Sequence, residues 1–244
     1  MNPLAQTHTA LADPDLKRTY NLHLFKEVAP RYDLITRVLS LGRDSSWKKW
    51  MLNQLPLHDV TQVLDLACGT GDITRALAVR YPTAKITGLD LTPEMLERAR
   101  VLGSSDLEFV EGDMMRTGRD SESCDAITGG YALRNAPDLD AALSEIHRLL
   151  RPGGQAAFLD FSASTNSCIR RLHYVVLWIW GALWGILLHW DPKVYAYIAR
   201  SLAHFPDRKH LQQLLESHHL PVRKTKRFMF GMIEVVICQK SAVR

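Results

Sequence analysis

The sequence has few cysteines, and no spacing joins them into a site. Cys68, Cys124, Cys168 and Cys238 are scattered over 244 residues without a CxxC pair, which argues against a zinc site and a disulfide framework. The histidines lack the HExxH spacing of a metal-binding helix, so no metal is predicted. This cysteine usage fits a reducing compartment, and a cytoplasmic location is expected.

The chain also lacks a strong excess of charge and an amino-terminal targeting pattern. Its formal net charge is only +4, and nucleic acid is not predicted as a partner. A dense basic group lies at 223–227, which either is a solvated strand edge or contacts an anionic membrane surface or acidic partner. Residues 1–15 show no basic segment followed by an apolar run, so we expect a flexible tail rather than a signal peptide.

Short apolar runs alternate with amphipathic helical spacing through the middle of the chain. This alternation predicts an α/β, Rossmann-like, doubly wound and mostly parallel sheet in a single domain over 16–244. The predicted strands are 60–66, 85–89, 107–110, 124–128 and 155–161, and the predicted helices between them are 73–80, 93–101 and 139–150.

Three further segments surround this predicted core, 60–162. Helical spacing over 16–56 predicts N-terminal helices that cap a substrate site. Residues 167–219 form a helical insertion after the fifth strand. Two strand-like runs within 221–240 predict an antiparallel hairpin that closes one sheet edge.

The first predicted strand runs into a glycine turn. Gly69 and Gly71 follow Asp65 where the chain must turn sharply and let a ligand approach the bare backbone, which indicates a nucleotide-type ligand. A tight strand–helix turn without a ligand is the alternative, because such a pattern is weak on its own. Asp90 ends the next strand, where a carboxylate can accept hydrogen bonds from both ribose hydroxyls.

The acidic residues of the turn favour S-adenosylmethionine over a dinucleotide. The third glycine of a dinucleotide fingerprint is replaced by Thr74, and Asp65 and Asp72 can hold the ammonium of a methionyl group directly or through water. After the third strand, Asp113 can accept from an adenine amino group while Met114 covers the ring. Met95 is a second candidate for the ring face, although a surface acid and core methionines are the alternative interpretation.

Three segments resemble a known family, the ubiquinone/menaquinone-biosynthesis C-methyltransferases, or UbiE/MenG group. The resemblance covers roughly 25–240 and rests on segments 32–47, 131–135 and 148–162, which read YDLITRVLSLGRDSSW, YALRN and RLLRPGGQAAFLDFS. The sequence departs from the family pattern at Ile35-Thr36, at Asp44 in place of a histidine, and at Asp160 in place of a glutamate.

The resemblance implies a fold, a cofactor and a set of site residues. The cofactor contacts that it implies fall on Thr70, Asp90, Leu91, Asp113, Met114 and Gly130. It also places Tyr32, Arg134 and Asn135 near the transferred methyl group, where they bind or polarise a quinol oxygen. Asp160 is a candidate general base. The alternatives to catalytic roles are a packing role for Tyr32, an ion pair for Arg134 and a structural carboxylate at Asp160.

The long apolar run at 172–190 contains four of the six tryptophans. Its strictly apolar centre, 175–188, is shorter than the roughly 20 residues of a membrane span, so a crossing is not predicted. The run is expected to cover a greasy substrate or to touch the membrane interface. A buried core helix or a homodimer contact is the alternative.

The resemblance to this family implies an enzyme that moves a methyl group from S-adenosylmethionine to a ring carbon of a demethylated polyprenyl quinol and leaves S-adenosylhomocysteine. Two other functions stay open at this point. One is methylation of another hydrophobic acceptor, such as a phospholipid amine or a polyketide-like ring. The other is a non-catalytic subunit of a biosynthetic complex that binds S-adenosylmethionine.

Overall fold

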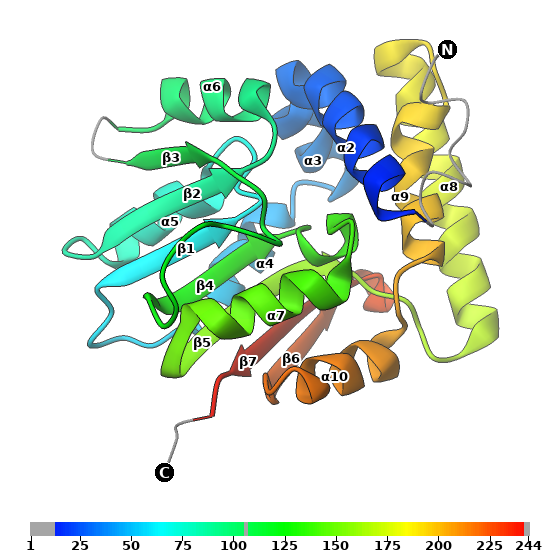
Figure 1. Cartoon of the computed structure of the whole chain (residues 1–244). Coiled ribbons are helices and arrows are strands. Elements are labelled where there is room, and N and C mark those ends of the chain that lie inside the picture. Colours follow the sequence, from blue (N-terminus) through cyan, green and yellow to red (C-terminus); the bar gives the residue numbers. More distant parts are fainter. Residues whose placement is uncertain (1–12, 105–106, 242–244) are drawn as a thin grey trace.

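A seven-stranded sheet forms the centre of the molecule (Figure 1). The computed structural model describes residues 13–104 and 107–241. The strands lie in the order β3-β2-β1-β4-β5-β7-β6; the first five are parallel, and β7 is antiparallel to both of its neighbours. This arrangement confirms the predicted fold class. The strands are β1 (Gln62–Leu66), β2 (Lys85–Asp90), β3 (Glu108–Glu111), β4 (Cys124–Gly130), β5 (Leu150–Phe161), β6 (Val222–Phe228) and β7 (Ile233–Gln239).

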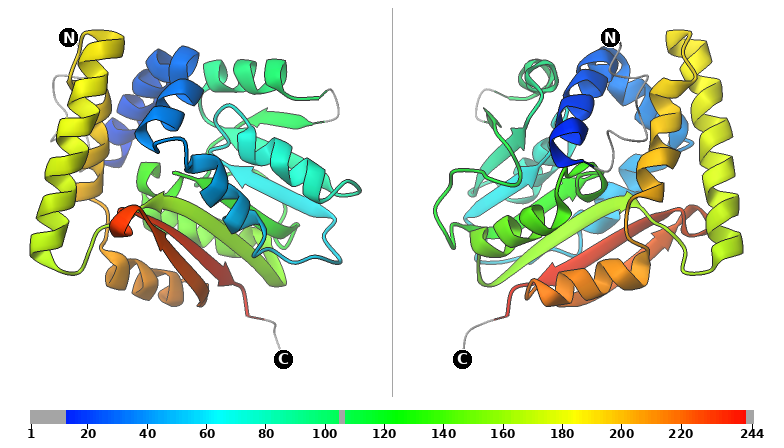
Figure 2. Two further views of the ribbon diagram at one scale, coloured as in Figure 1. Left: turned by 180° about the vertical axis from the view of Figure 1, so that it is seen from behind. Right: turned by 45° about the vertical axis from the view of Figure 1, so that its right-hand side comes forward.

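Helices cover both faces of the sheet. One face carries α4 (Asp44–Leu52) and α5 (Asp72–Arg80), and the other carries α7 (Leu139–Leu149) and α10 (Arg208–Ser217) (Figure 2). A fifth helix, α6 (Pro93–Leu102), packs beside β3. The buried apolar side chains of these helices leave the sheet as a rigid support for residues at the strand ends.

The amino-terminal helices lie beyond the carboxyl ends of the parallel strands. They are α2 (Pro14–Val28), η2 (Ala29–Arg31) and α3 (Tyr32–Leu39). The flexible tail predicted for 1–15 extends too far along the chain, because α2 begins at Pro14. The Asp13 side chain accepts from the backbone N–H groups of Asp15 and Leu16, and a capping aspartate followed by proline favours a helix start. The rest of the predicted tail, 1–12, lies outside the described residues.

The helical insertion forms a hairpin at one side of the molecule. Its two arms are α8 (Ser167–His189) and α9 (Lys193–Ala203), and glycines let their backbones approach closely. A Cβ atom on Gly181 would lie 2.5 Å from the backbone oxygen of Tyr195, and one on Gly185 would clash with the backbone oxygen of Asp191. Small residues at such contacts fix the distance between two helices, so the hairpin is a tightly packed unit.

The outer side of α8 is exposed, which overturns the interpretation as a buried core helix. By length and composition α8 is the one helix of the described residues that could cross a membrane, although one such helix is weak evidence, and only 22% of its most apolar window is buried. Its inner side packs on α9 and contributes to a cavity.

Candidate active site

Two neighbouring cavities, which share lining residues, lie at the carboxyl ends of the parallel strands. The smaller one, of about 80 Å³, is called here the cofactor cavity. Its walls come from the ends of successive strands, as in other doubly wound sheets. Most of the residues predicted to bind a cofactor line this cavity, namely Gly69 after β1, Asp90 and Leu91 at β2, Met95 on α6, Asp113 and Met114 after β3, and Gly130 on β4.

Asp90 is the acid most firmly held in this cavity. One carboxylate oxygen accepts from the backbone N–H of Gly69 at 2.8 Å, and the other accepts from that of Thr92 at 2.8 Å. Burial raises its pKa, while these N–H groups oppose the shift. A carboxylate has about four acceptor positions, so two remain for the hydroxyl groups of a ligand.

Asp113 and the two methionines complete the cofactor cavity. Asp113 pairs with Arg18 of α2, with 3.0 Å between Nη1 and Oδ2, which ties α2 over the cavity. Met95 and Met114 are almost fully buried and line the same space. Two sulfur-containing apolar walls beside two carboxylates suit an adenosine group, because its ring faces are apolar and its hydroxyl and amino groups are donors.

Gly71 and Thr70 shape the glycine turn but do not line the cavity. Gly71 has a φ of +79°, and a Cβ there would lie 2.7 Å from the Phe109 ring, so only glycine fits. The Thr70 hydroxyl donates to Asp33 of α3 at 2.6 Å. Both residues therefore hold the turn in position, and their predicted contacts with a cofactor stay predictions.

Asp65 likewise does not line the cofactor cavity. Its side chain is fully buried, and its two oxygens accept from the hydroxyls of Thr74 and Thr128 at 2.7 Å each. The carboxylate lies between the sheet and α5 and does not reach the cofactor cavity. Burial raises its pKa to about 7, against the lowering effect of the two hydroxyls.

We expect Asp65→Asn to remove a decline in stability between about pH 4 and pH 7. The folded pKa is about 7, whereas an unfolded aspartate titrates near 3.9. The folded state therefore holds more protons in this window, and the free energy of unfolding falls as the pH rises, by about 3 to 4 kcal/mol in total. Urea unfolding of both proteins across this range measures the difference in slope.

Asp125→Asn is the matched control for that experiment. Although burial opposes it, the pKa of Asp125 is lowered by the backbone N–H groups of Thr61 and Gln62. The ionised Asp125 carboxylate stabilises the fold at high pH, and this contribution is lost on acidification through its folded pKa. Asp125→Asn should therefore change the slope of the free energy of unfolding against pH in the sense opposite to Asp65→Asn. If the free energy of unfolding depends on pH equally in Asp65→Asn and the parent, Asp65 does not keep a proton in the folded state up to about pH 7.

Asp72, the other acid of the turn, has a partly exposed side chain that pairs with the buried Lys48. Lys48 lies between two carboxylates, at 2.5 Å from Asp44 and 2.6 Å from Asp72. Lys48 contacts Oδ2 of Asp44, and the hydroxyl of Tyr131 donates a hydrogen bond to the other carboxylate oxygen, Oδ1, at 2.6 Å. Burial raises the pKa of Asp44, while Lys48 opposes the shift. Asp72 does not line the cofactor cavity, and its predicted contact with a ligand ammonium, directly or through water, stays a prediction.

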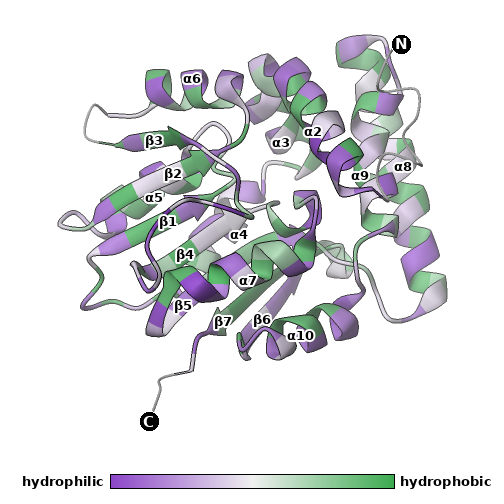
Figure 3. Cartoon of the chain, in the orientation of Figure 1, coloured by the Kyte–Doolittle hydropathy of each residue, from purple (hydrophilic) through white to green (hydrophobic). Residues whose placement is uncertain are grey.

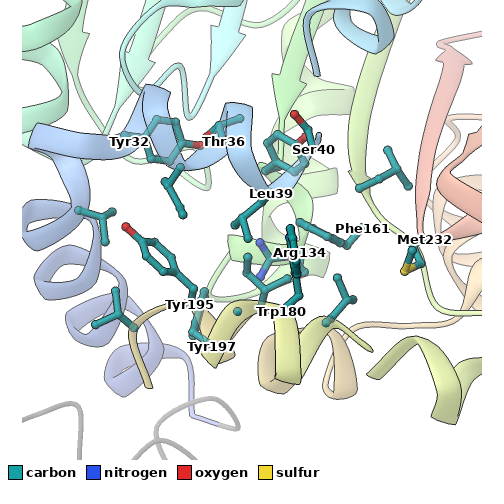
Figure 4. Close-up of a pocket in the computed structure, with 18 of the residues that line it drawn as sticks. Tyr32, Thr36, Leu39, Ser40, Arg134, Phe161, Trp180, Tyr195, Tyr197 and Met232 are labelled. Atoms are coloured by element: carbon teal, nitrogen blue, oxygen red, sulfur yellow. The ribbon is translucent and has the colours of Figure 1, made fainter. Parts of the chain in front are cut away.

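The larger cavity, called here the acceptor cavity, has a volume of about 260 Å³. Helices outside the sheet supply most of its wall, and nearly all of its lining is apolar or aromatic. Figure 4 shows Tyr32, Thr36 and Leu39 on one side, with Trp180, Tyr195 and Tyr197 opposite them. Such a lining suits a hydrophobic ligand that carries a few polar groups.

Four residues line both cavities, namely Phe25, Tyr32, Tyr131 and Asn135. These side chains form the boundary between the two cavities, called here the junction. The structure thus brings Tyr32 and Asn135, two predicted catalytic residues, to the junction. The Asn135 amide donates to the backbone oxygen of Tyr131 at 2.8 Å, and its side-chain oxygen accepts from Tyr197 at 2.9 Å, so its orientation is determined by these contacts.

Arg134 lines the acceptor cavity and is buried among oriented partners. Its guanidinium lies over the rings of Phe161 and Tyr197, at 5.2 and 5.6 Å from their centroids. It also donates to the hydroxyl of Ser201 and pairs with Asp160 at 3.4 Å. These contacts fix a cation in an otherwise apolar wall, where it acts strongly on a negative oxygen.

Asp160, in contrast, lines neither of the two cavities. Its oxygens accept from the backbone N–H groups of Arg134 and Phe161 at 2.9 and 2.8 Å. Burial raises its pKa, and Arg134 opposes the shift. The arrangement makes Asp160 a positioning residue for Arg134, and the prediction of a general base at Asp160 is not supported by its location.

Sequence reasoning missed several residues at the junction. Phe25 and Tyr197 gave no motif signal, because only the packing of α2 and α9 brings them to the site. The Asp44–Tyr131 contact had a partial signal, since both residues lie in segments that resemble the family. In the described part of the chain, no group of three or more His, Cys, Asp or Glu side chains could hold a metal ion.

The fold and the site together define a class I methyltransferase that depends on S-adenosylmethionine. Solved structures agree on the fold. A putative methyltransferase from Haloferax volcanii matches with a TM-score of 0.63 and 19% identity, covering 89% of this chain and 97% of that one. A Thermotoga maritima S-adenosylmethionine-dependent methyltransferase matches with a TM-score of 0.65 and 18% identity, covering 90% and 99%.

The family follows from sequence comparison. The model of the ubiE/COQ5 methyltransferase family matches residues 14–240, and the chain belongs to this family. A demethylmenaquinone methyltransferase from Deinococcus radiodurans is 33% identical over 221 residues, which are 87% of this chain and 90% of the relative. One from Staphylococcus aureus is 28% identical over 209 residues, or 84% and 87%. The predicted family and enzyme class are confirmed.

Proposed function

We propose that this enzyme methylates a ring carbon of a demethylated quinol that bears a hydrophobic tail. The observation that carries the proposal is the junction, where an apolar cavity with one fixed cation meets the cofactor cavity. The names of the relatives, demethylmenaquinone methyltransferases, support the same substrate class. An apolar wall of this size suits a polyprenyl tail, and Arg134 suits an oxygen that becomes negative.

S-adenosylmethionine supplies a methyl group that is already activated by its sulfonium. The chain must then hold the acceptor ring in line at close distance and remove a hydroxyl proton so that the ring carbon becomes nucleophilic. Tyr32 and Asn135 orient the ring at the junction. Arg134 stabilises the resulting oxyanion, and Asp160 keeps the guanidinium in place.

We assign the proton acceptor to the Tyr131–Asp44 pair. The acceptor hydroxyl gives its proton to the Tyr131 oxygen as the Tyr131 hydroxyl proton moves to Asp44, so charge and atoms balance. A buried carboxylate with a raised pKa is a stronger base than an exposed one. Lys48, held also by Asp72, balances the charge of Asp44 before the transfer. After methyl transfer the ring carbon loses its proton to water, and the ring oxygen takes back the proton held by Asp44 through Tyr131, so the aromatic quinol is restored and one proton is released overall.

The direct test is incubation of the purified protein with methyl-labelled S-adenosylmethionine and a panel of acceptors. The panel contains demethylated benzoquinols and naphthoquinols, a phospholipid amine and a polyketide-like ring. We expect label on a ring carbon of a quinol, located by mass spectrometry and NMR. Arg134→Lys keeps the positive charge but loses the planar guanidinium with its several N–H donors. We expect this variant to reduce kcat by about 10²-fold, because the oxyanion is stabilised less well.

Each other outcome of the panel assay has a definite meaning. Label on a nitrogen or oxygen would overturn the proposal in favour of another hydrophobic acceptor. Cofactor binding without transfer to any acceptor would favour a non-catalytic subunit. Lys209→Arg, on the surface of α10, is the matched control and should leave kcat unchanged.

A further inference from the structure

The exposed side of α8 forms one continuous apolar stripe. Along the helix its members recur at intervals of three and four residues, which places them on one face. Figure 3 shows hydrophobic residues recurring along this helix at the edge of the molecule. The stripe consists of Leu172, Val175, Val176, Ile179, Leu183, Ile186, Leu187 and Trp190, with Trp178 beside it, and each is 42 to 90% exposed.

The opposite side of α8 is committed to the domain. Gly181 packs against α9 and Gly185 against the turn that leads into it, and Leu177, Trp180 and Gly181 line the acceptor cavity. A membrane crossing would have to pull this side out of the protein. The helix is therefore placed to lie along a surface, at a length of roughly 35 Å for 23 residues.

The stripe is continuous with the wall of the acceptor cavity. Val176 belongs to both, because it is 42% exposed and also lines the cavity. A second hollow on the outer side runs between α8 and α9 and is lined by Tyr174, Val175, Trp178 and Ile179 together with residues of α9. Apolar surface thus extends from the outside of the molecule to the edge of the cavity.

Charged side chains stand at both ends of the stripe but not within it. Arg170, which pairs with Asp207 at 3.6 Å, and Arg171 precede it, and Asp191 and Lys193 follow it. At the same end Arg31 donates to the backbone oxygen of Leu188. Cations at the limits of an apolar, tryptophan-containing helix match phosphate headgroups around an acyl layer.

We propose that the stripe on α8 docks into the surface of a lipid bilayer, with α8 parallel to the membrane plane. The inference goes beyond the proposed function and does not depend on it, since lipid binding is measured without turnover. The apolar stripe supplies most of the affinity, and the cations at its ends supply the smaller part. A second copy of the chain is the rival occupant and is an outcome of the test.

Vesicle flotation tests the proposal with the full chain. Vesicles of phosphatidylcholine with one quarter phosphatidylglycerol are mixed with the parent and with Ile179→Glu/Leu183→Glu. We expect the parent to float and this variant to bind at least about tenfold more weakly, because two charges would enter the apolar layer. Tryptophan emission should shift to shorter wavelength on binding of the parent only.

Val79→Glu/Val101→Glu is the matched control. These valines are 85 and 84% exposed, lie on α5 and α6, and should leave flotation unchanged. Both variants must keep the parent's thermal unfolding temperature and affinity for S-adenosylmethionine, which are read separately from lipid binding. Binding by the parent should largely persist in 1 M salt, since apolar contacts are not screened.

Three results would overturn the proposal. The first is equal flotation of the parent and Ile179→Glu/Leu183→Glu, and the second is complete loss of binding in salt. The third is a lipid-free dimer in light scattering that this variant converts to a monomer, which would assign the stripe to a second copy. If the quinol assay fails while flotation behaves as expected, only the proposed function is wrong.

Discussion

Replacing Asp44 by asparagine is expected to lower kcat by about 10² to 10⁴-fold, the range for loss of a general base, with little change in affinity for S-adenosylmethionine. A side-chain amide at this position cannot take the proton that Tyr131 passes on. Lys48 keeps its 2.6 Å ion pair with Asp72, so the buried cation is not left without a partner. Steady-state kinetics with the quinol acceptor measure the loss, and calorimetry measures the cofactor affinity.

The pH profile separates a base from a purely structural carboxylate. Burial raises the pKa of Asp44, opposed by Lys48, so the parent should lose activity on acidification at a higher pH than an ordinary carboxylate requires. That acidic limb should vanish in Asp44→Asn. Tyr131→Phe should match its kcat, and the exposed Asp120→Asn should behave as the parent. An unchanged acidic limb in Asp44→Asn would exclude this carboxylate as the base.

Replacing Asp90 by alanine should weaken binding of S-adenosylmethionine by about 10²-fold or more. Each hydrogen bond to a charged group contributes about 1.5 to 3 kcal/mol, and Asp90 has two acceptor positions open to ribose hydroxyls. Isothermal titration calorimetry measures this loss. Because Asp90 also accepts from Gly69 and Thr92, Asp90→Ala should unfold at a lower temperature as well.

Two further variants separate binding from stability. The amide oxygen of Asp90→Asn can still accept a hydrogen bond from the backbone N–H of Gly69 or Thr92. This variant should therefore unfold at a temperature closer to that of the parent, while it still binds S-adenosylmethionine weakly. Glu94 is a partly exposed acid of α6 that pairs with Lys26 at 2.7 Å, and Glu94→Gln should leave cofactor affinity unchanged. Tight binding by a folded Asp90→Asn would place the ribose elsewhere.

The cofactor cavity was largely predictable from sequence because parallel strands bring their carboxyl ends to one edge. Asp90, Asp113 and Gly130 each follow or end a strand, and adjacency in the sheet places them together. The direction in which a side chain points is harder to predict than the position of its residue at a strand end. Asp65 stands near the end of β1, but its side chain points toward Thr74 of α5, and alternation along a strand does not identify which face holds a ligand.

The acceptor cavity was less predictable. Its wall combines α2, α3, α8 and α9, whose mutual packing no local pattern specifies. Tyr197 reaches Asn135 across 62 positions of sequence, and the role of Asp160 became clear only from the backbone N–H groups that hold it. Resemblance to the family placed Arg134 near the acceptor but gave no information on what orients it.

Separate parts of the chain build the two cavities, and this separation has an evolutionary consequence. Carboxylates, glycines and methionines at or near the strand ends line the cofactor cavity, whereas helices that the sheet does not constrain supply most of the wall of the acceptor cavity. Ile35 and Thr36, which depart from the family pattern, line the acceptor cavity. A lineage can therefore exchange one acceptor for another by drift in these helices while the methyl-donating half of the enzyme is inherited intact.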